Sequence, residues 1–179
     1  MSGVEESGIT AASVADLTGR LAQLKAEAVA ALVGADPGGG DAVIIGCDSL
    51  LDLDGEPLGK PASSASAVHR WRRMRGRAGV LHTGHHLVTR RSGAWRAYAE
   101  VASTTVHFAD LSDAEIDAYV ATGEPLQVAG AFTIDGLGGA FVTRIEGDHH
   151  NVVGISLPVL RTMLGTAGVD WPSLWVSAG

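Results

Sequence analysis

The residues best suited to chemistry lie in the stretch 43–61, VIIGCDSLLDLDGEPLGKP. Residues 43–45 form an apolar, β-branched run, which predicts a buried central strand. We expect this strand to end at Asp48 and Ser49, so that a carboxylate and a hydroxyl group emerge where ligands collect in open α/β sheets. The alternative is structural, because an Asp at the end of a strand is often a turn or capping residue.

A positively charged residue follows on the far side of a predicted hairpin. Residues 50–58 flank the turn Asp54-Gly55, which favours two short strands. The hairpin leads to Lys60, which lies between a glycine and a proline. An acid and a cation across one hairpin could face the same small anion, although a Gly-Lys-Pro segment is also common in surface loops.

A second lysine lies on a predicted helix upstream. Ser13 is a suitable N-cap for a helix that extends to about residue 32. Apolar residues recur along this helix at steps of three and four, and Lys25 falls near the middle of their stripe rather than on the polar face. Since an unpaired buried charge is costly, Lys25 must either find an anion or extend its amino group to solvent.

The composition indicates a single globular domain that does not bind nucleic-acid polymers. The 179 residues are 46% hydrophobic and carry a formal net charge of −7. The chain can therefore bury a sizeable core, but it lacks the basic surface that phosphate backbones require. The lone Cys47 excludes a disulfide framework and favours the cytoplasm. We expect no signal peptide and no membrane partner, because no apolar run is long enough to span a bilayer.

The remaining periodicity predicts further helices around two long strands. The predicted elements are helix 64–75, strands 79–91 and 95–108, a helix that begins at the capping box 112–115, strand 140–145 and a closing helix 158–163. Helix 64–75 carries a basic face of four arginines. This face either attracts phosphates or is an ordinary solvated surface.

Five histidines raise the alternative of a zinc protein: His82, His85, His86, His149 and His150. On a strand, His82 and His86 share one face, whereas His85 points to the other. Neither an H-E-x-x-H motif nor a set of cysteines accompanies them. A dedicated zinc site is therefore the weaker interpretation.

Several segments occur together in a recognisable order. They are L-A-Q-L-K-A-E-A-V-A, D-S-L-L-D-L-D-G-E-P-L-G-K-P, Y-V-A-T-G-E-P, A-G-A-F and G-D-H-H-N-V-V-G-I-S-L-P. This set resembles the Maf family (septum-formation-inhibitor-like nucleoside triphosphate pyrophosphatases) over nearly all of the chain. The resemblance implies one Maf-like domain over residues 1–179, with an α/β fold in which helices flank a central mixed β-sheet around a cleft. It also implies hydrolysis of ribo- or deoxyribonucleoside triphosphates, or modified forms of them, to the monophosphate and pyrophosphate.

The resemblance further assigns roles to individual residues. Asp48 is the implied proton acceptor and, together with Glu6, the implied ligand of a Mg²⁺ or Mn²⁺ ion. Lys25 and Lys60 are the implied phosphate contacts, and Ser49 is linked to the selection of the base. Such a set is sufficient for phosphoryl chemistry, which depends mostly on positioning and electrostatics.

The chain also departs from the family pattern. The family's S-x-S-P-R-R segment, whose arginine reaches the substrate, is missing from the sequence, so we expect an N-terminally shortened chain of weak activity. Val128 stands where a lysine is usual, and Asp135, in a turn tied to substrate choice, stands where a glutamine is frequent. A catalytically weak nucleotide-binding or regulatory protein is therefore the second interpretation, and a homodimer is also left open.

Overall fold

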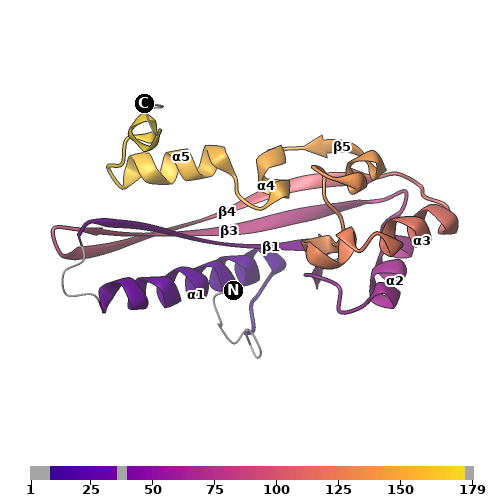
Figure 1. The fold of residues 1–179 in the computed structure, drawn as a ribbon, viewed down its shortest axis with the longest axis horizontal. Helices are drawn as coiled ribbons and strands as arrows, with labels where there is room; N and C mark the ends of the chain where they lie inside the picture. Colours follow the sequence, from indigo (N-terminus) through magenta and orange to yellow (C-terminus); the bar gives the residue numbers. More distant parts are fainter. Residues whose placement is uncertain (1–8, 36–39, 176–179) are drawn as a thin grey trace.

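A long sheet forms the centre of the protein and carries helices on both faces, in the computed structural model that describes residues 9–35 and 40–175 (Figure 1). Helix α1 lies along one face, α4 and α5 lie along the other, and α2 and α3 pack at one end. The helices are α1 Val14–Gly34, α2 Ser64–Met74, α3 Asp113–Ala121, α4 His149–Val153 and α5 Leu157–Thr166. The strands are β1 Ala42–Leu53, β2 Glu56–Leu58, β3 Ala78–Arg91, β4 Ala94–Phe108 and β5 Val142–Glu146. The predicted α/β class is thereby confirmed.

The sheet has the strand order β2-β1-β3-β4-β5, and each of these pairings is antiparallel. Positive φ angles at both residues of the turns Asp54-Gly55 and Ser92-Gly93 reverse the chain within two residues. Helix α2 lies at the end of the sheet where β1 finishes, so β3 starts at this end. Strand β3 is therefore antiparallel to β1. The sheet is therefore antiparallel throughout the described residues, rather than mixed as predicted.

Strand β1 continues to Leu53 and does not end at the Asp48-Ser49 pair, so that prediction is wrong. Its ladder with β3 is unbroken, with Asp48 opposite Gly84 and Ser49 opposite Thr83. Successive side chains of a strand point to opposite faces of the sheet. Asp48 and Ser49 therefore emerge on opposite faces instead of into one cleft.

The apolar start of β1 is buried on one face only. Ile44 packs against Ala26 of α1, whereas Val43 and Ile45 are 47% and 37% exposed. Strand β2 pairs with β1 only from Leu51 onward, so no neighbouring strand among the described residues covers the edge before it. The predicted complete burial of residues 43–45 is therefore wrong, because only the α1 face is covered.

Two glycines allow α1 to lie directly on the sheet. A Cβ atom at Gly46 would stand 2.4 Å from the Ala22 carbonyl oxygen, and one at Gly84 would stand 2.3 Å from the Thr18 carbonyl oxygen. Both distances are shorter than van der Waals contact, so the backbone of α1 occupies the space that side chains would need. Ser13 caps this helix, as predicted.

The largest core lies between α2, α3 and the ends of the long strands. Trp71 is fully buried there and makes edge-to-face contacts with Phe108, Tyr119 and Phe141. Its Nε1 donates a hydrogen bond to the Ala131 carbonyl at 2.8 Å, which fixes the turn before the last strand. Helix α3 begins at the predicted capping box. None of the described helices is long and apolar enough to cross a membrane.

Candidate functional site

An ion pair between Lys25 and Asp48 joins α1 to β1. Lys25 lies between Ala22 and Ala26, two residues of the helix face that rests on the sheet. The side chains of Lys25 and Asp48 are 27% and 13% exposed, so the pair is shielded but still reaches solvent. Of the two outcomes expected for a lysine in an apolar stripe, the structure shows the one in which it meets an anion.

Ser49 belongs to a separate polar network on the other face of the sheet. Its hydroxyl lies 2.8 Å from Thr83 Oγ1, and the Thr83 hydroxyl donates to the Asn151 carbonyl at 3.1 Å. Ser49 is thus the donor to Thr83, because each hydroxyl carries one proton. The structure connects Ser49 to α4 and does not bring it to Asp48. Burial raises the pKa of the Cys47 thiol to about 11, which excludes a thiolate nucleophile near neutral pH.

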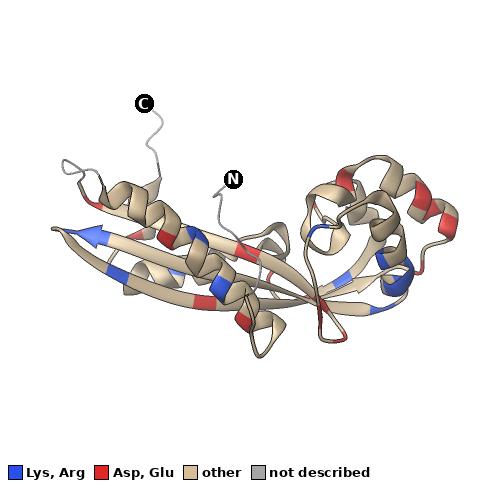
Figure 2. Ribbon diagram, turned by 90° about the horizontal axis from the view of Figure 1, so that it is seen from below, with Lys and Arg blue, Asp and Glu red and all other residues tan. Residues whose placement is uncertain are grey.

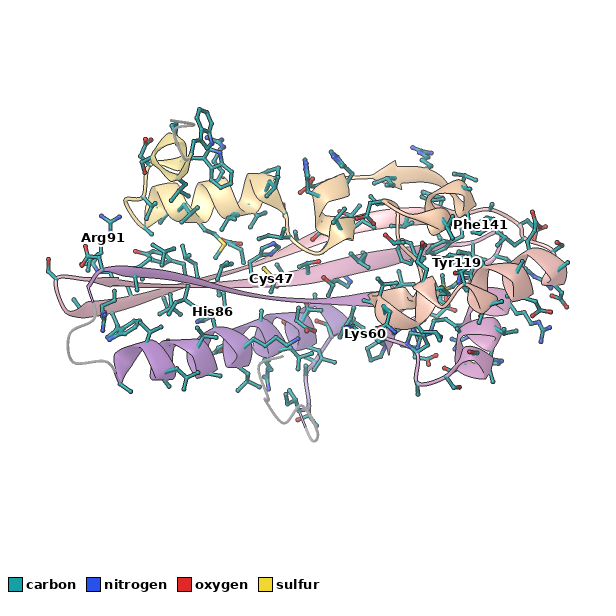
Figure 3. The ribbon with its side chains drawn as sticks, viewed as in Figure 1. Cys47, Lys60, His86, Arg91, Tyr119 and Phe141 are labelled. Carbon is teal, nitrogen blue, oxygen red and sulfur yellow. The ribbon has the colours of Figure 1, made fainter. Side chains whose placement is uncertain are left out.

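Lys60 is exposed in the loop after β2. Figure 3 shows it where the part of the sheet covered by α1 meets the end that carries α2 and α3. The Gly59 carbonyl before it accepts hydrogen bonds from the Gly130 N–H at 3.1 Å and from the Arg70 guanidinium. The Lys60 loop is thereby fixed to the turn 129–131 and to α2. The sequence pattern indicates only a general basic face for Arg70 and does not reveal this positioning role.

The other arginines of α2, and Arg75 at its C-cap, are paired with acids. Arg73 lies 2.6 Å from Glu56, and Arg75 and Arg72 lie 2.8 and 3.3 Å from Asp113. Hydrogen bonds from Arg72 and Arg75 hold the pKa of the Asp113 carboxyl below its ordinary value. Figure 2 shows the blue and red segments side by side at this end of the molecule. The basic face of α2 is therefore an ion-paired, solvated surface rather than a phosphate site.

Asp135 lies on an exposed turn, where it accepts a hydrogen bond from the Thr133 hydroxyl. Glu124 holds this turn, because its carboxylate accepts two backbone N–H bonds from residues 137–138 at 2.9 Å and one from the Tyr119 hydroxyl at 2.8 Å. Burial acts to raise the pKa of Glu124, but these hydrogen bonds outweigh it and lower the pKa. Glu124 belongs to the Gly-Glu-Pro segment that forms part of the family resemblance. Nothing in the sequence identifies the groups that its carboxylate binds.

The family model described as Maf-like protein matches residues 1–167. The chain belongs to the Maf family. A nucleoside triphosphate pyrophosphatase of Salinispora tropica is 56% identical to it over 176 residues, which cover 98% of this chain and 76% of the relative. Proteins of the same name from Cutibacterium acnes and Gloeothece citriformis are 52% and 46% identical over 97% of this chain, and the matches cover 82% and 85% of those relatives.

In this Maf-family chain, Asp48 suits a metal ion that takes most of its ligands from a substrate. Magnesium typically binds one or two carboxylates together with phosphate oxygens and water. Asp48 offers a single carboxylate, beside the ammonium group of Lys25. This set of protein ligands is incomplete without phosphate oxygens and water. Glu6, the other predicted ligand, lies outside the described residues. The described residues therefore fit a divalent metal ion that takes its remaining ligands from outside the protein.

The strand histidines of this Maf-family chain do not converge on a metal. His82 Nδ1 lies 2.8 Å from the Ser103 hydroxyl, and His85 Nε2 accepts a hydrogen bond from the Ser156 N–H at 2.8 Å. Neither ring nitrogen of His86, which is buried on the α1 side of β3 (Figure 3), has a hydrogen-bond partner within the described residues. Burial lowers the pKa of all three imidazoles, so they are neutral near pH 7.

Proposed function

We propose that this Maf-family chain is a nucleoside triphosphate pyrophosphatase, which cleaves the bond between the α- and β-phosphates. The products are a nucleoside monophosphate and pyrophosphate. The observation that carries the proposal is the Lys25–Asp48 pair, in which a cation and a carboxylate are held side by side at a partly shielded place on the sheet. Relatives that are 52–56% identical over nearly the whole chain bear this name.

The proposed chemistry requires positioned charges and a proton acceptor. When a triphosphate binds, Lys25 exchanges its contact with Asp48 for a contact with the phosphates. One carboxylate oxygen of Asp48 then accepts a proton from the attacking water, while the other is available to a metal ion. Lys60, on the loop fixed by Arg70, supplies a second positive charge. A Mg²⁺ or Mn²⁺ ion, held by Asp48 and Glu6, would offset the negative charge of the phosphates when bound.

Ser49 and Asp135 are the proposed contributors to the choice of nucleotide. Asp135 offers an exposed carboxylate on a turn that Glu124 holds in place. Ser49 acts indirectly, because its hydroxyl ties β1 to Thr83 of β3 directly behind Asp48. The cytoplasmic setting, a link to septum formation and a homodimeric assembly remain predictions from the sequence.

A nucleotide-binding protein without turnover is the second candidate. It is favoured by Val128, which stands beside the turn 129–131 at a place where the family pattern has a lysine. One cation fewer near the phosphates weakens the stabilisation of a leaving pyrophosphate. The charge of this missing lysine matters more for turnover than for binding. Valine at position 128 should therefore reduce turnover more than it reduces the affinity for a nucleotide.

A turnover screen tests the proposal and separates the two candidates. The purified chain is incubated with the common nucleoside triphosphates and their modified forms, with Mg²⁺ or Mn²⁺, and pyrophosphate and orthophosphate are measured separately. We expect pyrophosphate and monophosphate in equal amounts from at least one substrate. Orthophosphate as the first product would contradict the assigned bond. Calorimetric binding of a triphosphate without any product would favour the second candidate.

A further inference from the structure

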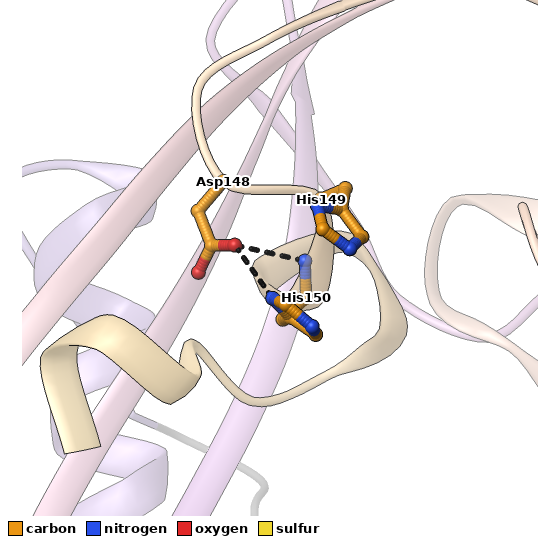
Figure 4. A group of neighbouring side chains, drawn as sticks. All are labelled: Asp148, His149 and His150. Carbon is orange, nitrogen blue, oxygen red and sulfur yellow. Dashed lines mark hydrogen bonds and ion pairs between the residues drawn. The ribbon is translucent and has the colours of Figure 1, made fainter. Parts of the chain in front are cut away.

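Outside the Lys25–Asp48 site, metal-ligating side chains gather at the start of α4. In residues 9–35 and 40–175, the group Asp148, His149 and His150 brings its ligand atoms within 4.8 Å of one another (Figure 4). We propose that these three residues form a binding site for a borderline divalent transition-metal ion such as Zn²⁺. The site lies on the sheet face opposite the Lys25–Asp48 pair, because α4 and α1 cover opposite faces.

Two of the three ligand atoms already have the spacing of a zinc site. Asp148 Oδ1 lies 3.1 Å from His150 Nδ1. Two ligands at about 2.1 Å from a tetrahedral zinc ion stand about 3.4 Å apart. The proton of the neutral His150 ring resides on Nε2 when Nδ1 binds the ion. An ion bound between Asp148 and His150 would therefore replace the hydrogen bond that now joins these two atoms and leave their separation nearly unchanged.

The third ligand comes from the neighbouring ring. The rings of His149 and His150 have centroids 3.9 Å apart and planes inclined by 36°. His149 is exposed, so its ring can rotate without disturbing the core. One nitrogen of each ring and one oxygen of Asp148 already lie within 4.8 Å of one another, so a rotation of the His149 ring is enough to bring all three around one ion.

The framework beneath the site is held in place. Asp148 Oδ1 accepts a hydrogen bond from the His150 N–H at 3.0 Å, and Oδ2 accepts one from the Ser156 hydroxyl at 2.6 Å. The Thr104 hydroxyl donates to the Asp148 carbonyl at 2.9 Å, which ties this residue to β4. These hydrogen bonds thus hold the Asp148 carboxylate beside two solvent-accessible imidazoles.

The donor set selects the kind of metal. Two imidazole nitrogens and one carboxylate suit Zn²⁺, Ni²⁺, Co²⁺ or Cu²⁺, whereas Mg²⁺ prefers oxygen ligands. Three protein ligands leave the fourth tetrahedral position to water. The site therefore differs in chemistry from the proposed Mg²⁺ site at Asp48, and it does not depend on the proposed function.

Competition for Zn²⁺ with a chromogenic chelator tests the proposal, in a buffer with excess Mg²⁺ to occupy oxygen-donor sites. We expect the full chain to remove one equivalent of Zn²⁺ from the chelator. His149→Ala and His150→Ala should each weaken binding at least about tenfold, since even residues that only support a metal ligand contribute that much. The matched control is His69→Ala, which removes an exposed histidine from α2 and should leave the affinity unchanged.

A measurement on the unmodified chain provides a test that does not depend on variants. Nuclear magnetic resonance of the imidazole nitrogens, during addition of less than one equivalent of Zn²⁺, should shift the signals of His149 and His150 and leave that of His69 in place. The proposal is overturned if the double variant His149→Ala/His150→Ala binds Zn²⁺ as tightly as the parent. It is equally overturned if other histidines respond first in the titration.

Discussion

Replacing Gly46 by alanine should lift α1 from the sheet at the position of Lys25. The added Cβ would stand 2.4 Å from the Ala22 carbonyl oxygen and 2.7 Å from the Ala26 N, whereas ordinary contact begins at 3.4 Å. The difference, 3.4 − 2.4 = 1.0 Å, is the displacement that the helix backbone must make. Ala22 and Ala26 flank Lys25, so the displacement is greatest where the lysine meets Asp48.

The expected magnitudes follow from this displacement. Overpacking of this kind costs about 1–3 kcal/mol of unfolding free energy, and about 0.5–1 kcal/mol is recovered because alanine is less flexible than glycine in a strand. We therefore expect Gly46→Ala to lower the free energy of unfolding by up to about 2.5 kcal/mol. A displacement of about 1 Å in a positioned group can reduce a rate by about a hundredfold, so pyrophosphate release should fall much more than stability.

Urea denaturation and a pyrophosphate-release assay measure the two effects. Gly165→Ala in α5 is the matched control, because a Cβ there would meet no atom within 4 Å. It should raise the free energy of unfolding by about 0.5–1 kcal/mol through the helix propensity of alanine and leave turnover unchanged. If Gly46→Ala is as stable and as active as Gly165→Ala, the close seating of α1 does not position Lys25 and the reasoning is refuted.

Two further predictions concern charge and protonation. Lys25→Met and Lys60→Met keep an apolar stem but remove the charge, so calorimetry should show a larger loss of affinity for a triphosphate than for its nucleoside; equal losses would mean that the lysines are structural. Burial holds the pKa of His82, His85 and His86 below the value in the unfolded chain. The unfolded chain therefore binds more protons, and the free energy of unfolding should fall as the pH drops below about 6.5. The fall is up to about 1.4 kcal/mol per pH unit for each histidine. His86→Met removes two ring nitrogens that have no hydrogen-bond partner within the described residues, so it should raise stability and flatten this pH dependence. A steeper dependence in urea denaturation at pH 5.5 and 7.5 would contradict the assignment.

Elements whose ends depend on local chemistry could be predicted from the sequence. The Ser13 cap, the capping box of α3 and the turn Asp54-Gly55 all occur where their residue types indicated. Each depends on contacts within a few residues, so the sequence window contains the relevant partners. The position of Lys25 within the apolar stripe is of the same kind, because helical periodicity alone places it toward the sheet.

Features that depend on distant partners could not be predicted in this way. The length of β1 is set by its ladder with β3, which carries the strand through Asp48 and Ser49 and separates their side chains. Arg70 binds the Gly59 carbonyl, and Glu124 binds the Leu137 N–H. Both partners lie more than ten residues away along the chain, so no local pattern reveals these roles. Alternation of side chains along a strand follows from simple geometry, but it assigns faces correctly only once the extent of the strand is known.

Pyrophosphate release by Asp48→Asn, compared with the parent chain, tests most directly whether the Lys25–Asp48 pair is the reaction centre. Asparagine keeps the size of the side chain but cannot accept a proton from water. The account predicts that the parent releases pyrophosphate from a nucleoside triphosphate and that Asp48→Asn is at least about a hundredfold slower. The variant should keep a cooperative thermal unfolding transition. Turnover within a few-fold of the parent, at an unchanged melting temperature, would contradict the central claim.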